Sequence, residues 1–582
     1  MIDMKGILRD LRTMFVPFLS WIGELKDKDT IRSDVIAGVT VAMVLVPQSM
    51  AYAQLAGLPA YYGLYASFLP PMVAAIFGSS RQLATGPVAV VSLLTAAALE
   101  PIAAANPEGF LAYAVLLAVL VGLFQLFLGL FRLGVLVDFL SHPVVIGFTN
   151  AGALIIATSQ MGKLFGVTAV QADHHYEKVW SMIEAAVHNT HLPTFGMAVL
   201  AFAILILMKK YAPRLPGVLV AVVITTVIAW LSGYAEAGGK IVGKIPEGLP
   251  AFTIPDFNWE AVKTLMVTAI TISLIGFMEA ISIAKAMAAR TRQRLDANQE
   301  LVGQGLSNIV SGMFSGYPVS GSFSRSAVNI DAGAVTGMSS VVTGLVVGIA
   351  LLFLTPLLYH LPQATLAAVI IMAVVNLVKI KPIIHAWHAE PHDGVVAVIT
   401  FALTLFFAPH LEEGILIGVL LSLVLFLFRS MRPRVAELSR FHDNTMRDVS
   451  VHDLETSPKI ALFRFDGDLF FANAGYFENQ ILQMVADKPE LRFIILDAEG
   501  INAIDATGEE VLSNTIERLH AQNIELVVAR MKKQFIDALR RTHLYEAMGE
   551  NSFYSRVTYA LDYVWDSLGD SYDRTTCPLR RH

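Results

Sequence analysis

The fold is decided by a short segment that reads PVSGSFSRSAVN, Pro318–Asn329. A proline and a glycine interrupt the chain just before an apolar stretch that runs only from about Ser322 to Ala332. A helix needs roughly 20 apolar residues to span a bilayer, so this stretch is too short to do so. It also contains Arg325, and an arginine at the centre of a membrane helix costs at least ~2.5 kcal/mol. Such a residue normally faces a cavity, which makes the segment a candidate ligand site.

A second short segment has the same character. It reads TGPVAVVS at Thr85–Ser92, and its apolar part runs from Gly86 to Leu99. The longer apolar stretches, each a candidate membrane helix, lie near residues 35–55, 61–77, 109–131, 139–161, 194–208, 216–232, 262–284, 299–315, 335–357, 364–378, 393–408 and 413–428. With both short segments the total is about fourteen, and the short ones are the third and the tenth. These are corresponding positions in two halves, which is typical of a transporter built from two inverted repeats of about seven segments.

The composition agrees with a polytopic α-helical membrane protein. Hydrophobic residues make up 55% of the 582 residues and charged residues only 15%. The first 32 residues carry charges throughout, so we expect no cleaved signal peptide and a first apolar span that stays in the membrane. Cys577 is the only cysteine, which excludes an intrachain disulfide and a cysteine metal site.

Positive charge predicts the orientation of the spans. With a cytoplasmic N-terminus, the loops on the cytoplasmic side hold most of the basic residues, namely Arg81, Arg132, Lys209, Lys210, Arg214, Lys285, Arg290, Arg292, Arg294, Lys379 and Lys381. The opposite loops hold fewer lysines, spread over two long segments. Because cytoplasmic loops carry an excess of Lys and Arg, and because the number of spans is even, we expect both termini in the cytoplasm.

A soluble domain follows the membrane region. Strands are expected at Lys459–Phe465, Leu491–Leu496 and Ile524–Arg530, alternating with helices near residues 475–486, 506–521 and 533–541. This alternation predicts a small α/β domain. We therefore expect an N-terminal arm (1–32), a membrane domain (33–430), a linker (431–448), the α/β domain (449–566) and a C-terminal tail (567–582).

Arg325 is the centre of the candidate site. It lies in the first turn of the tenth segment, where free backbone N–H groups and the helix dipole favour an anion. The hydroxyls of Ser322 and Ser324 add hydrogen-bond donors. If the third segment directs its own N-terminus at the same point, an oxyanion fits between the two. Two other interpretations of Arg325 remain: a side chain that reaches the membrane surface, and a buried ion pair that joins two helices.

Several long motifs resemble the sulfate permease (SulP) family of anion transporters. They are PAYYGLYASFLPPMVAAIFGSSRQLATGPVAVVS (Pro59–Ser92), GFMEAISIAKAMA (Gly276–Ala288) and SGSFSRSAVN (Ser320–Asn329). Near the C-terminus, GDLFFANAGYFENQI and ILDAEGINAIDATG are similar to the STAS domain that ends such proteins. The resemblance covers the chain from about Arg32 to Val564.

The resemblance implies an arrangement and a set of anion contacts. It implies two intertwined repeats divided into a core and a gate domain, and a homodimer in a bacterial inner membrane. The anion would contact Val88 on the third segment and Phe323 beside the serines of the tenth. Gln48 and Tyr52 on the first segment would complete the site, and their spacing of four residues places them on one helix face.

The resemblance also implies two residues with other roles. Glu279 stands where the family places a residue that couples transport to a proton or another ion. The alternative is a structural acid that pairs with Arg325 or Lys285. In the soluble domain, Thr507 stands where soluble relatives carry a phosphorylated serine, and the alternative is a helix cap.

The expected function is secondary active transport of a small oxyanion, with proton-coupled sulfate uptake as the leading hypothesis. The alternatives are a dicarboxylate or bicarbonate carrier, and an anion exchanger or channel regulated through the STAS domain. No hydrolase, kinase or metalloprotease signature appears, so no enzyme activity is expected. The expected partners are the inorganic anion, protons, membrane lipid, a second copy of the chain, and a regulatory protein or nucleotide on the STAS domain. No cofactor and no nucleic acid are expected.

Overall fold

The computed structural model describes residues 17–105, 109–135, 140–168, 174–212, 215–246, 248–569 and 572–580. The chain divides into two compact units, Met1–Ser422 and Leu423–His582. Residues 1–16 of the expected N-terminal arm and Arg214 of the expected cytoplasmic loops lie outside the described residues.

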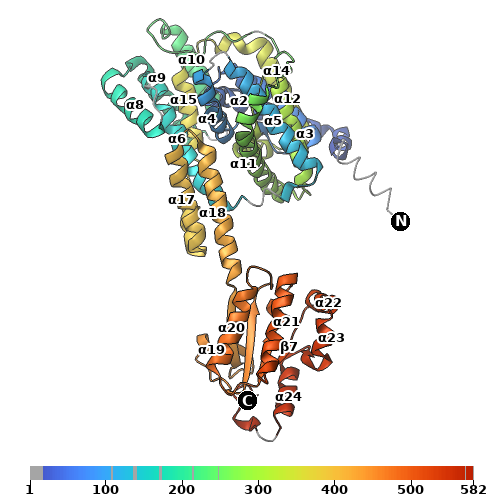
Figure 1. Ribbon diagram of the computed structural model, residues 1–582. Coiled ribbons are helices and arrows are strands. Elements are labelled where there is room, and N and C mark those ends of the chain that lie inside the picture. The colour runs from blue at the N-terminus through green and yellow to red at the C-terminus, as the bar shows by residue number, and fades with distance from the viewer. Residues whose placement is uncertain are drawn as a thin grey trace. The chain divides into compact units, whose positions relative to one another are not determined.

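The first unit is built from helices (Figure 1). In chain order they are α2 (Lys28–Leu55), α3 (Tyr61–Phe77), α4 (Ala89–Ala105), α5 (Phe110–Leu130), α6 (His142–Ser159), α7 (Met161–Phe165), α8 (His175–Asn189), α9 (Leu192–Tyr211), α10 (Gly217–Leu231), α11 (Trp259–Thr291), α12 (Ala297–Met313), α13 (Phe323–Asp331), α14 (Met338–Ile349), α15 (Gln363–Val374), α16 (Ile380–Ala389), α17 (Pro391–Phe407) and α18 (Leu411–Met431). Each predicted segment coincides with one of these helices. Among the described residues, seven helical stretches are long and apolar enough to cross a membrane, and shorter apolar helices accompany them.

Besides the five-residue α7, two longer helices were not predicted, α8 and α16. Both mix charged or polar residues with apolar ones, as in HYEKVWSMIEAAVHN of α8. Neither contains an apolar run of spanning length, so a search for such runs passes over them. They are amphipathic helices between the spans.

Two glycines allow α5 and α12 to pack closely, and α12 supports the site described below. A Cβ on Gly122 of α5 would lie 2.6 Å from the carbonyl oxygen of Gly305, and a Cβ on Gly305 would lie 2.6 Å from the backbone nitrogen of Leu126. No larger residue fits at either position without moving the backbone. Small residues allow membrane helices to pack at this distance, so α12 is held firmly against α5.

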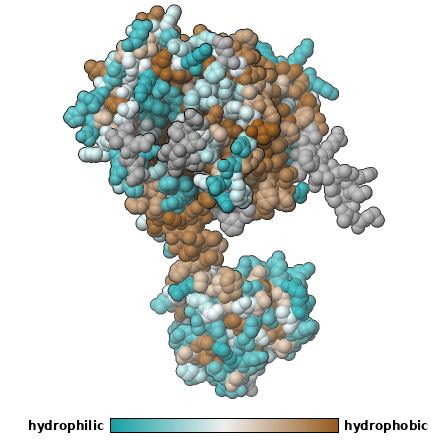
Figure 2. Space-filling model, turned by 45° about the horizontal axis from the view of Figure 1, so that its top comes forward, coloured by the Kyte–Doolittle hydropathy of each residue, from teal (hydrophilic) through white to brown (hydrophobic). Residues whose placement is uncertain are grey.

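The surfaces of the two units differ in kind. On the face shown in Figure 2, hydrophobic side chains cover much of the first unit, and hydrophilic ones cover most of the second. Large exposed apolar side chains of the first unit include Phe127 on α5, Ile206 on α9 and Leu420 on α18. This is the surface expected of a unit that is embedded in lipid.

The second unit is an α/β domain with one six-stranded sheet. The strands are β3 (Arg434–Arg440), β4 (Met446–Asp448), β5 (Ile460–Asp466), β6 (Phe493–Asp497), β7 (Glu525–Ala529) and β8 (Phe553–Tyr554), in the order β4-β3-β5-β6-β7-β8. Strands β5 to β8 run parallel, whereas β3 is antiparallel to both of its neighbours. The helices are α19 (Val449–His452), α20 (Ala474–Asp487), α21 (Ala506–Ala521), α22 (Lys533–Arg541), α23 (Leu544–Met548) and α24 (Val557–Leu568).

Hydrophobic layers cover both faces of this sheet. Phe463 of β5 packs in one layer with Phe477 of α20 and Leu512 of α21. Its neighbour Leu462 packs in the other layer with Leu561 of α24. Successive strand residues point to opposite faces, so each buried strand contributes to both layers. The predicted strands and helices of the domain lie within a residue or two of their expected bounds.

The expected linker at residues 431–448 is wrong. These residues contain β3 and β4, and β3 lies inside the sheet between β4 and β5. Its Ala436 and Leu438 are buried. Charged residues alternate with these apolar ones, and the run is short, so the sequence pattern resembles a polar connection.

The tail expected from residue 567 also belongs to the domain in its described part. Cys577 and Leu579 are buried in the hydrophobic layer that contains α24. The buried side chain of Arg440 donates from Nε to the carbonyl oxygen of Leu579 at 2.7 Å. The domain therefore extends from β3 to at least Leu579.

Candidate functional site

The two short segments meet at their N-terminal ends, as the sequence predicted. The pairs Thr85–Gly86 (β1) and Ser320–Gly321 (β2) form a two-stranded antiparallel sheet. The half-helices α4 and α13 begin directly after it. The backbone N–H of Ser322 donates to the carbonyl oxygen of Ala84 at 3.0 Å. The free N–H groups of two helix starts are thereby placed close together.

Buried polar side chains hold this crossing in place. Asn308 of α12 accepts from the N–H of Val319 at 2.8 Å and donates to its carbonyl oxygen at 3.1 Å. Gln304, one turn earlier, donates to the Thr85 hydroxyl at 2.9 Å. These positioning residues were missed from the sequence. The signal was present, since two amide side chains four residues apart occupy one face of a mostly buried helix.

A cavity of about 720 Å³ reaches the crossing point. We call it the Gln48 cavity. It brings together every predicted anion contact except Arg325, and its lining includes Gln48 and Tyr52 of α2, Val88 before α4, and Ser322, Phe323 and Ser324 at the start of α13. Glu279 of α11 lines the cavity as well. Four segments that are far apart in the sequence thus contribute to it: α2, the residues before α4, α11 and the start of α13.

Three polar side chains at the crossing are open to a ligand, those of Ser322, Ser324 and Gln48. Ser322 is the N-cap residue of α13, yet its side chain does not cap the helix. Its hydroxyl lies 3.5 Å from that of Ser324. Gln48 is 8% exposed, and its Oε1 has no hydrogen-bond partner in the described part of the chain. An oxyanion can accept hydrogen bonds from the two serine hydroxyls and from the Nε2 amide group of Gln48.

Arg325 lies behind the cavity and not on its wall. Its side chain is 0% exposed, and none of its guanidinium nitrogens has a hydrogen-bond partner among the described residues. It lies against Gly86, where a Cβ would come within 3.4 Å of Nη2, and the backbone φ of Gly86 is +154°. The hydroxyls of Tyr52 and Tyr317 lie within its electrostatic range. A buried positive charge without a counter-ion therefore stands close to the cavity.

Glu279 pairs with neither of its predicted structural partners. It is partly buried, and among the described residues no hydrogen bond or ion pair engages its carboxyl group. Arg325 is not within ion-pair distance, and Lys285 is exposed. The carboxyl group lies within electrostatic range of Tyr52, on the wall of the Gln48 cavity.

The wall of the Gln48 cavity also carries cationic and polar residues away from the crossing. Lys209 of α9 and Lys379 before α16 line it, together with His142 and Asn150 of α6. No other described carboxyl group except that of Glu279 lines this cavity. The lining thus carries two lysines against one glutamate, an excess of positive charge.

Thr507 lies in the second unit, the α/β domain. It is an exposed residue in the first turn of α21, and Asp505 already caps the helix by accepting from the N–H of Gly508 at 2.8 Å. The cap is thus a role of Asp505, and the hydroxyl of Thr507 remains accessible. Its regulatory role stays a prediction.

Crossed half-helices, a buried guanidinium behind them and a cavity that reaches the crossing are the features of a membrane transporter for anions. Comparison with known proteins gives the same class. The model of the sulfate permease family matches residues 31–400, and that of the STAS domain matches residues 452–560. The chain belongs to the sulfate permease family, whose members are transporters and not enzymes.

The similar proteins span nearly the whole chain. The chloroplastic sulfate transporter 4.1 of Arabidopsis thaliana is 38% identical over 579 residues, which cover 95% of this chain and 84% of the relative. The solved structure of SLC26A9 matches with a TM-score of 0.89 at 23% identity and covers 98% of this chain and 95% of that chain. The transmembrane domain of the cyanobacterial bicarbonate transporter BicA matches with a TM-score of 0.57 at 25% identity, over 68% of this chain and 98% of that chain. The predicted fold class is thereby confirmed: inverted repeats of membrane helices followed by a STAS domain.

Proposed function

We propose that the chain takes up sulfate together with protons, and that the anion binds at the crossing of α4 and α13. The observation that carries this proposal is Arg325, a fully buried cation for which the described residues supply no partner. Leaving such a charge uncompensated is costly. A bound oxyanion supplies the missing negative charge.

The charge of the site and the similarity to a sulfate transporter both favour sulfate as the anion. Arg325 and two helix N-termini of about +0.5 charge each give a site that suits a divalent anion. The Arabidopsis relative, at 38% identity, is a sulfate transporter. Bicarbonate is the second candidate, because BicA shares the fold at 25% identity. A dicarboxylate is the third, since the Gln48 cavity has room for one.

Glu279 supports coupling to protons. It lies on the wall of the same cavity as the anion contacts, and no described residue neutralises it. When a divalent anion arrives, the negative charges repel each other unless Glu279 takes up a proton. Anion and proton then favour each other's binding, as reciprocal coupling requires.

The charged residues of the Gln48 cavity also support an orientation. Lys209 and Lys379 line it, and both belong to loops that the excess of positive charge assigns to the cytoplasmic side. In this proposal the cavity opens toward the cytoplasm, both termini lie there, and the protein works as a homodimer in a bacterial inner membrane.

The test is sulfate accumulation in proteoliposomes with and without an inward proton gradient. The parent protein is expected to concentrate sulfate on the gradient. Glu279→Gln, which resembles the protonated state, is expected to keep sulfate exchange and to lose the response to the gradient. Glu260→Gln is the matched control, because Glu260 lies on the same helix but is exposed and outside the cavity.

Two results would contradict parts of the proposal. If Glu279→Gln still concentrates sulfate as the parent does, Glu279 does not couple protons. If bicarbonate or fumarate competes with labelled sulfate more strongly than unlabelled sulfate does, the anion has been misassigned.

A further inference from the structure

A second cavity lies at the opposite ends of the helices that line the Gln48 cavity. We call it the Lys163 cavity; its volume is about 420 Å³. Residues of α6 from His142 to Asn150 line the Gln48 cavity, whereas Ile155 and Ser159 of the same helix line the Lys163 cavity. The helices α9 and α15 are divided in the same way, with their C-terminal parts lining the Gln48 cavity and their first residues the Lys163 cavity.

Only a thin layer separates the two cavities. On α2, Tyr52 lines the Gln48 cavity and Leu55 the Lys163 cavity; on α4, the corresponding residues are Val90 and Leu93. Both pairs are three residues apart, which is about 4.5 Å along a helix. Leu55 and Leu93 are each 6% exposed. The cavities are therefore two ends of one route, closed by about one helical turn of buried side chains.

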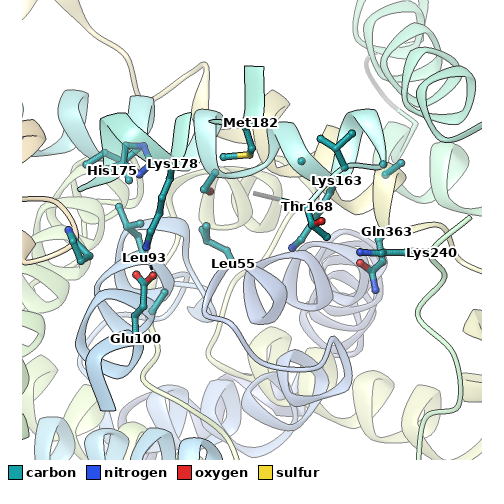
Figure 3. Close-up of a pocket in the computed structure, with 18 of the residues that line it drawn as sticks. Leu55, Leu93, Glu100, Lys163, Thr168, His175, Lys178, Met182, Lys240 and Gln363 are labelled. Atoms are coloured by element: carbon teal, nitrogen blue, oxygen red, sulfur yellow. Dashed lines mark hydrogen bonds and ion pairs between the residues drawn. The ribbon is translucent and has the colours of Figure 1, made fainter. Parts of the chain in front are cut away.

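The Lys163 cavity is lined by more cations than anions. Figure 3 shows Lys178 directed at Glu100, with which it forms an ion pair. Glu100 carries the only carboxyl group among the described lining residues, and this group is already paired with Lys178. Two lysines remain on the wall, Lys163 of α7 and Lys240.

Neither remaining lysine has a carboxylate partner in the described chain. Lys163 Nζ has one long contact, 3.4 Å to the carbonyl oxygen of Gln54, and no contact of Lys240 Nζ appears among the described residues. The two ammonium groups lie within electrostatic range of each other and so repel. Gln363 and Thr168 lie beside them on the wall (Figure 3) and offer further polar groups. Two like charges in a partly enclosed space are stabilised by an anion between them.

We infer that Lys163 and Lys240 form a second oxyanion site, which holds the transported anion at the end of the route opposite the Gln48 cavity. The inference rests on the proposed function, since it assigns the same anion to a second position. The site is distinct from the crossing of α4 and α13, because it uses side-chain ammonium groups from α7 and the segment after α10. In transport it receives the anion at one face of the membrane.

The direct test measures whether sulfate protects Lys163 from chemical modification. An impermeant amine-acylating reagent is applied to the purified full-length protein, and the modified lysines are quantified by mass spectrometry. At a sulfate concentration of ten times its Kd, about nine tenths of the sites are filled, so acylation of Lys163 is expected to slow by about tenfold. Lys244 is the internal control, because it is exposed on the same segment as Lys240 but does not line the cavity.

A variant separates this site from the first one. Arg325→Ala is expected to abolish binding at the crossing and to leave the protection of Lys163 intact. If sulfate fails to slow acylation of Lys163 in the parent, or if the protection disappears in Arg325→Ala, the second site is wrong.

Transport from the two faces gives the functional readout. In the double variant Lys163→Gln/Lys240→Gln, the KM for sulfate at one face is expected to rise by at least about tenfold, the effect of losing even one of its two charge-assisted contacts. The KM at the other face is expected to stay within about twofold, and Lys244→Gln to leave both unchanged. Equal KM values for double variant and parent at both faces would overturn the inference and leave the proposed function standing. If sulfate protects Lys163 in a parent protein that transports no sulfate, the proposed function is overturned and the second anion-binding site stands.

Discussion

At the scale of the residue, the buried guanidinium of Arg325 dominates the energetics of the empty carrier. It is 0% exposed and has no hydrogen-bond partner in the described chain. The guanidinium lies beside Gly86, where an added Cβ would stand 3.4 Å from Nη2, and it therefore packs against the crossing of the half-helices. In a medium of low effective dielectric its charge acts over several ångströms. Arg325 can therefore attract an anion in the cavity without lining the cavity wall.

This arrangement predicts opposite effects of Arg325→Met on stability and on binding. Without anion, the variant should unfold at the same or a higher temperature than the parent, because an uncompensated buried charge is removed. Its affinity for sulfate should fall by at least about hundredfold, or ~2.7 kcal/mol. Thermal unfolding with and without sulfate measures both effects.

Two further variants sharpen this prediction. Arg325→Lys should recover little affinity, since a compact ammonium group cannot reproduce the wide guanidinium fork. Arg290→Met is the control, because Arg290 forms an exposed ion pair with Asp331 on the surface. Undiminished sulfate affinity in Arg325→Met would remove Arg325 from the anion site.

At the scale of the element, β3 decides where the soluble domain begins. It pairs with β5 through four residue pairs from Arg434↔Asp466 to Glu437↔Phe463, and with β4 on its other side. Leu438 is 2% exposed, and burial of a leucine contributes about 1.5–3 kcal/mol. Without β3, the edge of β5 would expose a row of unpaired backbone groups. The strand is therefore part of the folding unit.

We expect a fragment of residues 430–582 to unfold in one cooperative transition, and a fragment of residues 449–582 not to do so. Urea titration followed by circular dichroism compares the two. The shorter fragment lacks β3 and β4 and also leaves Leu579 without the hydrogen bond from Arg440. Equal midpoints for the two fragments would show that β3 and β4 are dispensable for the fold.

The β3–β4 pair also predicts a loss of stability in acid. The Ser450 hydroxyl and the Arg434 guanidinium hold the pKa of Asp448 below its ordinary value of 3.8. A lowered folded-state pKa gives a stabilising contribution that is complete above the unfolded pKa and is lost as the pH falls through the folded pKa. The free energy of unfolding of the 430–582 fragment should therefore decrease below about pH 4.

Asp448→Asn should make this decrease shallower, because the residue can no longer take up a proton. Asp562→Asn, at an exposed position of α24, serves as the control. The measurement is urea unfolding at about pH 5 and about pH 3. The same pH dependence in Asp448→Asn and in the parent fragment would contradict the assignment.

At the scale of the whole molecule, the first unit contains two cavities that we interpret as the two ends of one route. The Gln48 and Lys163 cavities occupy opposite ends of α6, α9 and α15, and α2 and α4 contribute to both. A transporter must expose its site to one face at a time. We expect the exchange of access to take place at the thin layer between the cavities.

Single cysteines in the two cavities should react from opposite faces of the membrane. Phe323→Cys reports on the Gln48 cavity, where Phe323 is 61% exposed, and Ala96→Cys reports on the Lys163 cavity. Native background is low, since Cys577 is the only cysteine and is 5% exposed. An impermeant thiol reagent is added to one side of sealed vesicles at a time. Labelling of both cysteines from the same side would show that the cavities are not two ends of one route.

The sequence by itself determined the membrane spans, the two short segments at corresponding positions, and the helices and central strands of the soluble domain. Apolar runs, Gly-Pro breaks and residue periodicity are local properties, and each specifies its element without reference to the rest of the chain. Ser322 and Ser324 were expected from this local pattern, and Gln48, Tyr52, Val88, Phe323 and Glu279 from the family motifs. All seven line one cavity, and their roles remain predictions.

Only the tertiary structure decided which distant groups meet. Asn308 binds Val319, which lies 11 residues further along the chain, and Gln304 binds Thr85 in the other repeat. No local pattern assigns either amide its partner. The place of Arg325 behind the cavity depends on its approach to Gly86, and the Lys163 cavity depends on α7 facing the end of α2. The strand β3 was missed for the same reason: its alternating charged residues look like a polar linker until β4 and β5 pair with it on both sides.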